Sequence, residues 1–138
     1  MREILFRGKR IDNGEWVFGS LHSEYGETDK SGKKNIDYRI LGMRGECDYV
    51  IPETVGQLTG LTKNGTKIFE GDIVKHYCGG INDRLVDTGV VFWDSSRCMF
   101  LRTSDDGSSN HQIWSNCRYE VIGNIHDNPE LLEEGSND

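Results

Sequence analysis

The stretch Lys67–Tyr77, KIFEGDIVKHY, decides the fold class. Apolar pairs stand on both sides of the acidic cluster Glu70-Gly71-Asp72. An Asp that follows a Gly at the start of a strand commonly accepts hydrogen bonds from backbone N–H groups in its own turn. We therefore interpret the cluster as a turn between two strands. The alternative is a carboxylate pair or triad of Glu70, Asp72 and Glu53 that performs acid–base chemistry.

Short apolar runs between turns recur along the rest of the chain. Seventeen Gly and two Pro among 138 residues favour many turns and few long helices. Asn13-Gly14 and Asn64-Gly65 have the composition of hairpin turns. A helix signal is present only in NPELLEE, residues 128–134, where Asn128 suits the N-cap and Pro129 the first helical position. We predict an all-β fold in a single domain, residues 1–138, with a short C-terminal helix.

The charge of the chain is negative and unevenly distributed. Sixteen Lys and Arg against 23 Asp and Glu give a net charge of −7, which disfavours non-specific binding to nucleic acid. Residues 1–45 nevertheless carry nine basic and seven acidic residues, so a local basic face remains an option. No apolar run approaches the roughly 20 residues that span a bilayer, and no apolar signal sequence begins the chain. We expect a cytoplasmic protein with no membrane contact and with reduced cysteines.

Cysteines and histidines show no spacing typical of a metal site. The four Cys are widely spaced without a Cys-x-x-Cys, and the four His lie in four separate segments with no two within four residues. A zinc or hydrolytic centre would need residues far apart in sequence to converge. A Cys nucleophile with a His partner is conceivable at Cys78 or Cys117, but inert thiols are more common. We therefore predict no metal, no cofactor and no catalytic residue.

Two polar segments are candidate binding sites. Arg7 and Arg10 belong to a basic cluster, and stacking of nucleic acid bases on Trp16 and Phe18 beside it is one interpretation. The more common arrangement places Trp16 and Phe18 in the core.

The polar segment His22–Asn35 is expected to form a mobile loop or a hairpin tip.

The second candidate segment, PETVGQLTG, spans residues 52–60. Its polar side chains Glu53, Thr54 and Gln57 lie among glycines that would permit close approach of a ligand or a partner strand. A structural bend or bulge is the favoured interpretation. The glycine spacing and the Lys-Ser/Thr of a phosphate-binding loop are missing.

Three blocks together resemble one known family. They are EILFRGKRIDNGEWVFGSL near the N-terminus, VIPETVGQLTGLTKNGTKIFEGDIVK in the middle and YEVIGNIHDNPELL near the end. In this order they are similar to the YopX family, small proteins of phages and prophages mainly of Gram-positive bacteria. Here GLTKNG is one residue shorter than in many members. The resemblance implies mostly β structure in barrel-like sheets, and it implies no catalytic residue, cofactor or substrate.

Three functions follow as hypotheses. The first is a non-enzymatic phage or prophage accessory protein that binds a macromolecule, with another protein as the favoured partner and a homo-oligomer as one option. The second is a nucleic-acid-binding module that uses the basic N-terminal strands. The third is a small hydrolase that uses Glu53, Glu70 or Asp72.

Overall fold

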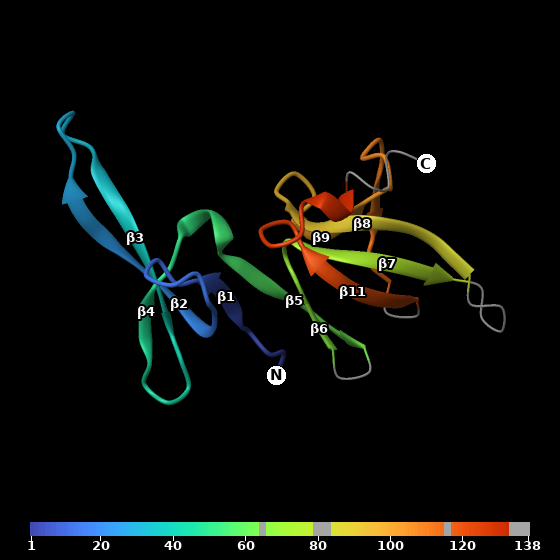
Figure 1. Ribbon diagram of the computed structural model, residues 1–138, viewed down its shortest axis with the longest axis horizontal. Coiled ribbons are helices and arrows are strands. Elements are labelled where there is room, and N and C mark those ends of the chain that lie inside the picture. The colour runs from blue at the N-terminus through green and yellow to red at the C-terminus, as the bar shows by residue number, and fades with distance from the viewer. Residues whose placement is uncertain (64–65, 79–83, 115–116, 133–138) are drawn as a thin grey trace. The chain divides into compact units, whose positions relative to one another are not determined.

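The structure is a computed structural model that describes residues 1–63, 66–78, 84–114 and 117–132 (Figure 1). It consists of two compact units, Met1–Leu58 and Thr59–Asp138. That these two units act as a single domain stays a prediction. The all-β prediction is confirmed, because antiparallel strands make up most of both units.

The first unit is an antiparallel sheet with the strand order β4-β3-β2-β1-β5. Its β1 and β2 are joined by a turn in which Gly14 has a φ of 73°, as predicted for Asn13-Gly14. A single 3₁₀ turn, η1 (Pro52–Thr54), separates β4 from β5. The strands are β1 (Phe6–Lys9), β2 (Trp16–Thr28), β3 (Lys34–Leu41), β4 (Cys47–Tyr49) and the start of β5 (Gly56–Lys63).

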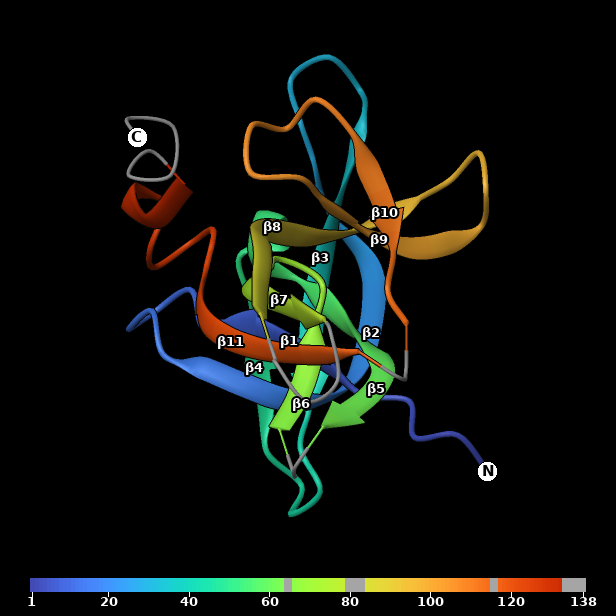
Figure 2. The same cartoon turned by 90° about the vertical axis from the view of Figure 1, so that its right-hand side faces the viewer.

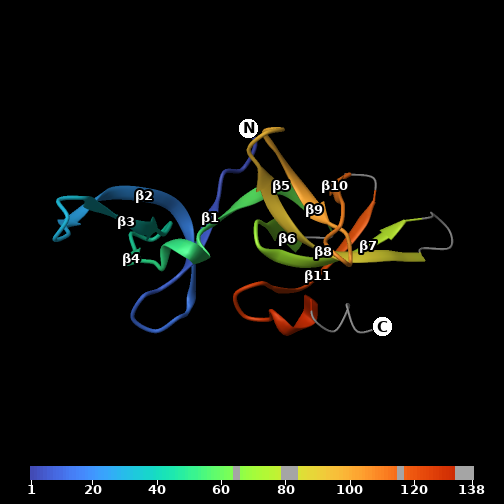
Figure 3. The ribbon, with the colours of Figure 1, turned by 90° about the horizontal axis from the view of Figure 1, so that it is seen from above.

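The β2–β3 hairpin is much longer than the sequence indicated. Of the two forms predicted for His22–Asn35, a mobile loop or a hairpin tip, the structure shows the hairpin tip: most of the segment is strand, and residues 29–33 form the turn between β2 and β3. The length of the strands was not predicted, because a strand without a buried face does not alternate between apolar and polar residues. Figures 1 and 3 show β2 and β3 continuing as a two-stranded ribbon beyond β4.

The second unit contains the end of β5, β6 (Thr66–Phe69) and a five-stranded antiparallel sheet. The order in that sheet is β10-β9-β8-β7-β11, so its end strands β10 and β11 are not hydrogen-bonded neighbours in the described residues. The expected barrel is therefore not closed. The sheet strands are β7 (Asp72–Cys78), β8 (Arg84–Asp94), β9 (Met99–Thr103), β10 (Asn110–Gln112) and β11 (Arg118–Asn124).

A buried apolar cluster on one face of this sheet forms the core of the second unit. Val74 of β7, Val91 of β8 and Tyr119 of β11 pack there with Ile68 of β6. Alternate residues of a strand point to the same face, so His76 of β7 and Val121 of β11 lie on the same face as this cluster.

The chain leaves β11 through a turn and enters a helical turn at residues 130–132 (Figure 2). The Leu131 N–H donates to the Asn128 carbonyl at 3.1 Å. The Asn128 side chain was predicted to cap the helix, but its oxygen accepts a hydrogen bond from the N–H of Asn124 at 3.2 Å. This bond connects the turn to the end of β11. The hairpin turn predicted at Asn64-Gly65 lies outside the described residues.

Substitution of Gly89 by Ala is expected to destabilise the second unit. Gly89 is buried in β8, and a Cβ atom there would collide with the carbonyl oxygen of Thr103 in β9. Overpacking of this kind costs roughly 1–3 kcal/mol of unfolding free energy, measurable by urea denaturation. Gly107→Asn is the control, because Gly107 lies in an open turn with a φ of 74° that Asn tolerates. Equal stability of Gly89→Ala and the unsubstituted chain would contradict this packing.

The carboxylate of Asp106 is expected to titrate at unusually low pH. The hydroxyl and N–H of Ser108 and the hydroxyl of Ser104 all donate to its Oδ1, at 2.7, 2.9 and 2.8 Å, and they lower its pKa from 3.8 to about 2. The stabilisation is therefore present above the ordinary pKa and is lost as the pH falls through about 2. Ser108→Ala should raise the pKa of Asp106 in an NMR titration, whereas Ser109→Ala should leave it unchanged.

Candidate functional site

The two arginines of the predicted basic site are both engaged within the first unit. Arg7 of β1 is buried, and its guanidinium carbon lies 4.7 Å from the centre of the Trp16 ring. Arg10 pairs with Asp12 at 2.7 Å and with Asp48 at 3.4 Å. Both guanidiniums therefore already interact with groups of the first unit, and binding of a ligand by Arg7 and Arg10 stays a prediction.

Among the polar residues predicted around η1, Thr54 bonds to the backbone. The Thr54 hydroxyl donates to the Ile51 carbonyl at 2.6 Å and accepts from the Lys9 N–H at 2.9 Å. Gln57 lies in β5 opposite Phe6 of β1, and Glu53 is exposed. The favoured interpretation of this segment as a bend is confirmed for Thr54, which joins the bend to β1.

The acidic cluster of the second unit forms the predicted turn. Gly71 has a φ of 87°, and Asp72, 2% exposed, accepts the Phe69 N–H at 2.7 Å. Glu70 is half-buried beside it. Glu53 belongs to the first unit, so Glu70 and Asp72 are the two of the three carboxylates that one unit brings together. The turn interpretation is confirmed.

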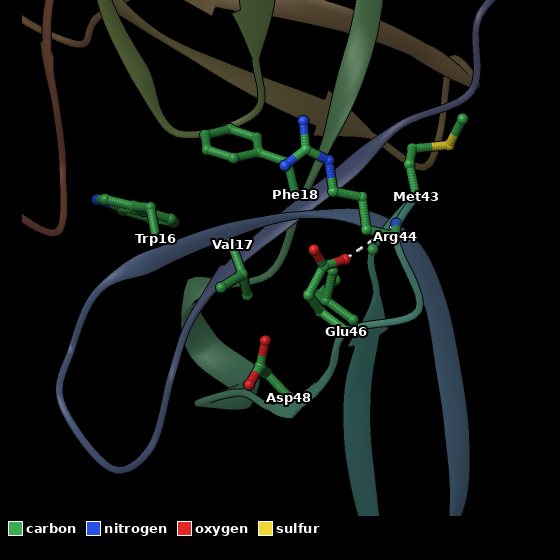
Figure 4. A pocket seen from close by; sticks show the side chains of 9 residues that line it. Trp16, Val17, Phe18, Met43, Arg44, Glu46 and Asp48 are labelled. Atoms are coloured by element: carbon green, nitrogen blue, oxygen red, sulfur yellow. Dashed lines mark hydrogen bonds between the residues drawn. The ribbon is translucent and has the colours of Figure 1, made fainter.

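A concave surface in the first unit has apolar and charged sides (Figure 4). It has a volume of about 420 Å³. Phe18 was expected in the core, but its side chain lines this concave surface and is 49% exposed. Met43 in the turn between β3 and β4 is fully exposed. The lining residues are Trp16, Val17, Phe18, Ile40, Gly42, Met43, Arg44, Glu46 and Asp48.

The outer half of the β2–β3 ribbon exposes an apolar pair. Tyr25 of β2 lies opposite Ile36 of β3, and the two residues are 74% and 49% exposed. Further along the ribbon, Glu24 accepts hydrogen bonds from Arg39 at 3.0 Å and from Tyr49 at 3.1 Å. Its carboxylate thereby raises the pKa of Tyr49 and joins β2 to β3 and β4.

A buried polar cluster that the sequence did not reveal lies in the second sheet. Arg102 of β9 donates to Asp87 of β8 at 2.6 Å, and its second nitrogen lies 2.7 Å from Nδ1 of His76 in β7. The His76 ring stacks on Tyr119, with 5.1 Å between the ring centres. Burial, and then the charge of Arg102, hold the pKa of His76 below its ordinary value. Both effects favour the neutral form of the imidazole.

Two cysteines lie beside this histidine. Cys78 follows His76 on the same face of β7, and Tyr77 is paired with Arg118 of β11. Continuing this register by one position places Cys117 opposite Cys78. A ring nitrogen of His76 and the two sulfur atoms lie within 4.8 Å of one another. In the sequence these residues occur as His76-x-Cys78 and Cys117-x-Tyr119. The two patterns indicate a common cluster only when β7 is known to pair with β11.

Comparisons with known proteins identify the family. The family model described as YopX protein matches residues 5–133, so the chain belongs to the YopX family. The resemblance based on the three sequence blocks is confirmed. No curated protein matches the chain.

A solved structure has a similar fold. The crystal structure of protein EF1440 from Enterococcus faecalis is 23% identical and covers 96% of this chain and 99% of its own, with a TM-score of 0.50. At this identity the likeness shows the fold alone. Within the described residues, no helix is long and apolar enough to cross a membrane.

Substitutions in the acidic cluster should change stability in a graded way. Asp72→Ala removes the acceptor of the buried Phe69 N–H and should cost about 1–3 kcal/mol of unfolding free energy. Asp72→Asn keeps an acceptor oxygen and should cost less. Glu53→Gln, at an exposed carboxylate outside this turn, is the control and should stay within about 0.5 kcal/mol. Urea denaturation measures all three, and a stable Asp72→Ala variant would rule out this role for the turn.

Proposed function

We propose that this YopX family member is a non-enzymatic accessory protein of a phage or prophage, located in the host cytoplasm, that acts by protein–protein binding. In this proposal two copies pair through the outer edge of β3, and the paired molecule presents its surfaces to a further protein. The observation that carries the proposal is the outer part of the β2–β3 ribbon, where no strand of the described residues pairs with that edge of β3. The phage or prophage setting is supported by the family resemblance.

The free edge can be located by residue. The Val50 N–H donates to the Tyr38 carbonyl, so the backbone groups of Tyr38 point toward the β4 side of the sheet. Backbone groups alternate in direction along a strand, so those of Ile36 and Lys34 point the same way. β4 ends before it reaches them. Unpaired edges of this kind accept an additional strand.

The sequence of this edge is complementary to itself. If two copies of β3 pair antiparallel about Asn35, Lys34 lies opposite Ile36 of the other copy and the outward backbone groups bond. Lys33 then lies opposite Asp37 of the other copy. Because the dimer would have two-fold symmetry, this ion pair would form twice. Opposite charges directly across two strands stabilise the pairing, and like charges destabilise it.

The exposed apolar pair supports the same conclusion. A two-stranded ribbon is only marginally stable in water, and exposed apolar side chains commonly mark an interaction site. Tyr25 and Ile36 lie beside the proposed seam, so pairing would cover part of both. Mixed charges along the ribbon, and the engagement of Arg7 and Arg10, favour a protein partner over nucleic acid.

Sedimentation equilibrium of charge variants tests the proposal. The unsubstituted chain should associate to a dimer. Lys33→Asp and Asp37→Lys each create two like-charge pairs and should raise the dissociation constant about tenfold. The double variant Lys33→Asp/Asp37→Lys restores opposite charges and should recover the affinity. Lys30→Asp, in the turn between the strands, is the matched control. A monomer at all concentrations, or a double variant as weak as the single ones, would overturn this mode of pairing.

A further inference from the structure

We propose that His76, Cys78 and Cys117 form a binding site for Zn²⁺ in the second unit, with a fourth position open to solvent. The proposal rests on the convergence of one imidazole and two thiols from β7 and from the residue before β11. It is independent of the ribbon and of protein–protein binding.

The donor set suits zinc. Two thiolates and one imidazole are soft or borderline ligands, which zinc prefers over the carboxylate and carbonyl oxygens that Mg²⁺ and Ca²⁺ bind. Two thiolates balance the two positive charges of the ion. With Zn–S bonds of about 2.3 Å, a tetrahedral site holds two sulfur atoms roughly 3.8 Å apart. The observed limit of 4.8 Å exceeds this by on the order of 1 Å, which side-chain rotation can supply.

The histidine has a nitrogen left for the ion. His76 is 7% exposed, and among the residues that the structure describes its Nε2 has no hydrogen-bond partner. Burial of an unsatisfied polar atom is costly, so such an atom indicates a missing ligand or water. The other nitrogen, Nδ1, faces Arg102 and lies 3.6 Å from Oδ1 of Asp87.

Asp87 is the positioning residue of the site. A metal on Nε2 requires the imidazole proton on Nδ1, where a carboxylate is the usual acceptor. Asp87 can accept a hydrogen bond from this N–H after a small approach of the two groups, which now lie 3.6 Å apart. Arg102 keeps its 2.6 Å hydrogen bond to Asp87 and moves away from Nδ1, because a guanidinium cannot accept a hydrogen bond from a protonated ring nitrogen.

The ion would connect two strands of the sheet. His76 and Cys78 belong to β7, whereas Cys117 directly precedes β11, which lies at the edge of the sheet. A metal held by all three would secure the beginning of β11 against β7. Cys78 is exposed, so the ion and its fourth ligand can enter from solvent.

Titration of the reduced full-length chain with Co²⁺ tests the site. Co²⁺ substitutes for Zn²⁺ and reports thiolate ligation through sulfur-to-cobalt absorption in the near ultraviolet. We expect one Co²⁺ per chain, displaced by Zn²⁺, and a higher melting temperature with Zn²⁺. Cys78→Ser and Cys117→Ser should each weaken binding more than tenfold and reduce the absorption. Asp87→Asn should weaken it about 10- to 100-fold.

Cys98→Ser is the matched control, because Cys98 is an exposed cysteine of the same unit outside the cluster. It should bind Co²⁺ as the unsubstituted chain does. Circular dichroism verifies that each variant is folded, and Cys78→Ser, at an exposed position, keeps the test valid if Asp87→Asn unfolds. No thiolate absorption, unchanged binding in both Cys78→Ser and Cys117→Ser, or a Cys78–Cys117 disulfide that persists in reductant would overturn the proposal.

Discussion

The turn at Gly71 and Asp72 is the constraint on which the second unit depends. Asp72 holds the Phe69 N–H, while Gly71 donates its N–H to the Val91 carbonyl at 2.8 Å and accepts from Ile125 at 2.9 Å. One residue pair thus fixes the end of β6, the start of β7, a point on β8 and the exit from β11. A side chain at position 71 would be strained at a φ of 87°, so the backbone of glycine and the carboxylate of Asp72 act together. The acidic cluster is architectural for this reason.

Because this turn sets where β7 begins, it also sets which residues of β7 point into the core. Val74 packs in the apolar cluster, and His76 and Cys78 follow at intervals of two on the same face. β11 provides the matching series Val121, Tyr119 and Cys117. The paired strands therefore change along their length from an apolar pair to an aromatic pair and then to a pair of thiols. The position of the proposed metal site is a consequence of strand register.

Local features of this chain could be predicted from sequence, and pairings between distant segments could not. The Gly71-Asp72 turn and the Asn13-Gly14 turn depend on neighbouring residues, so their composition was sufficient. The burial of Arg7 was not predictable, because it results from the position of Trp16 across the β1–β2 pair. The approach of Cys117 to Cys78 likewise depends on the choice of β11 as the partner of β7. No spacing rule for metal ligands includes that choice.

The ribbon and the sheet illustrate opposite relations between sequence and structure. In β7 a buried face demands apolar residues at alternate positions, and a polar residue is retained there only with partners such as Arg102 and Asp87 for His76. The outer part of the ribbon has few buried residues, so its strands need no alternating apolar residues. Their polar composition therefore did not indicate strands in the sequence. The fold places few requirements on the order of charges at Lys33 and Asp37. The hairpin does not need the self-complementary charges at that edge in order to form, and the pairing of two copies proposed above is the role that would use them.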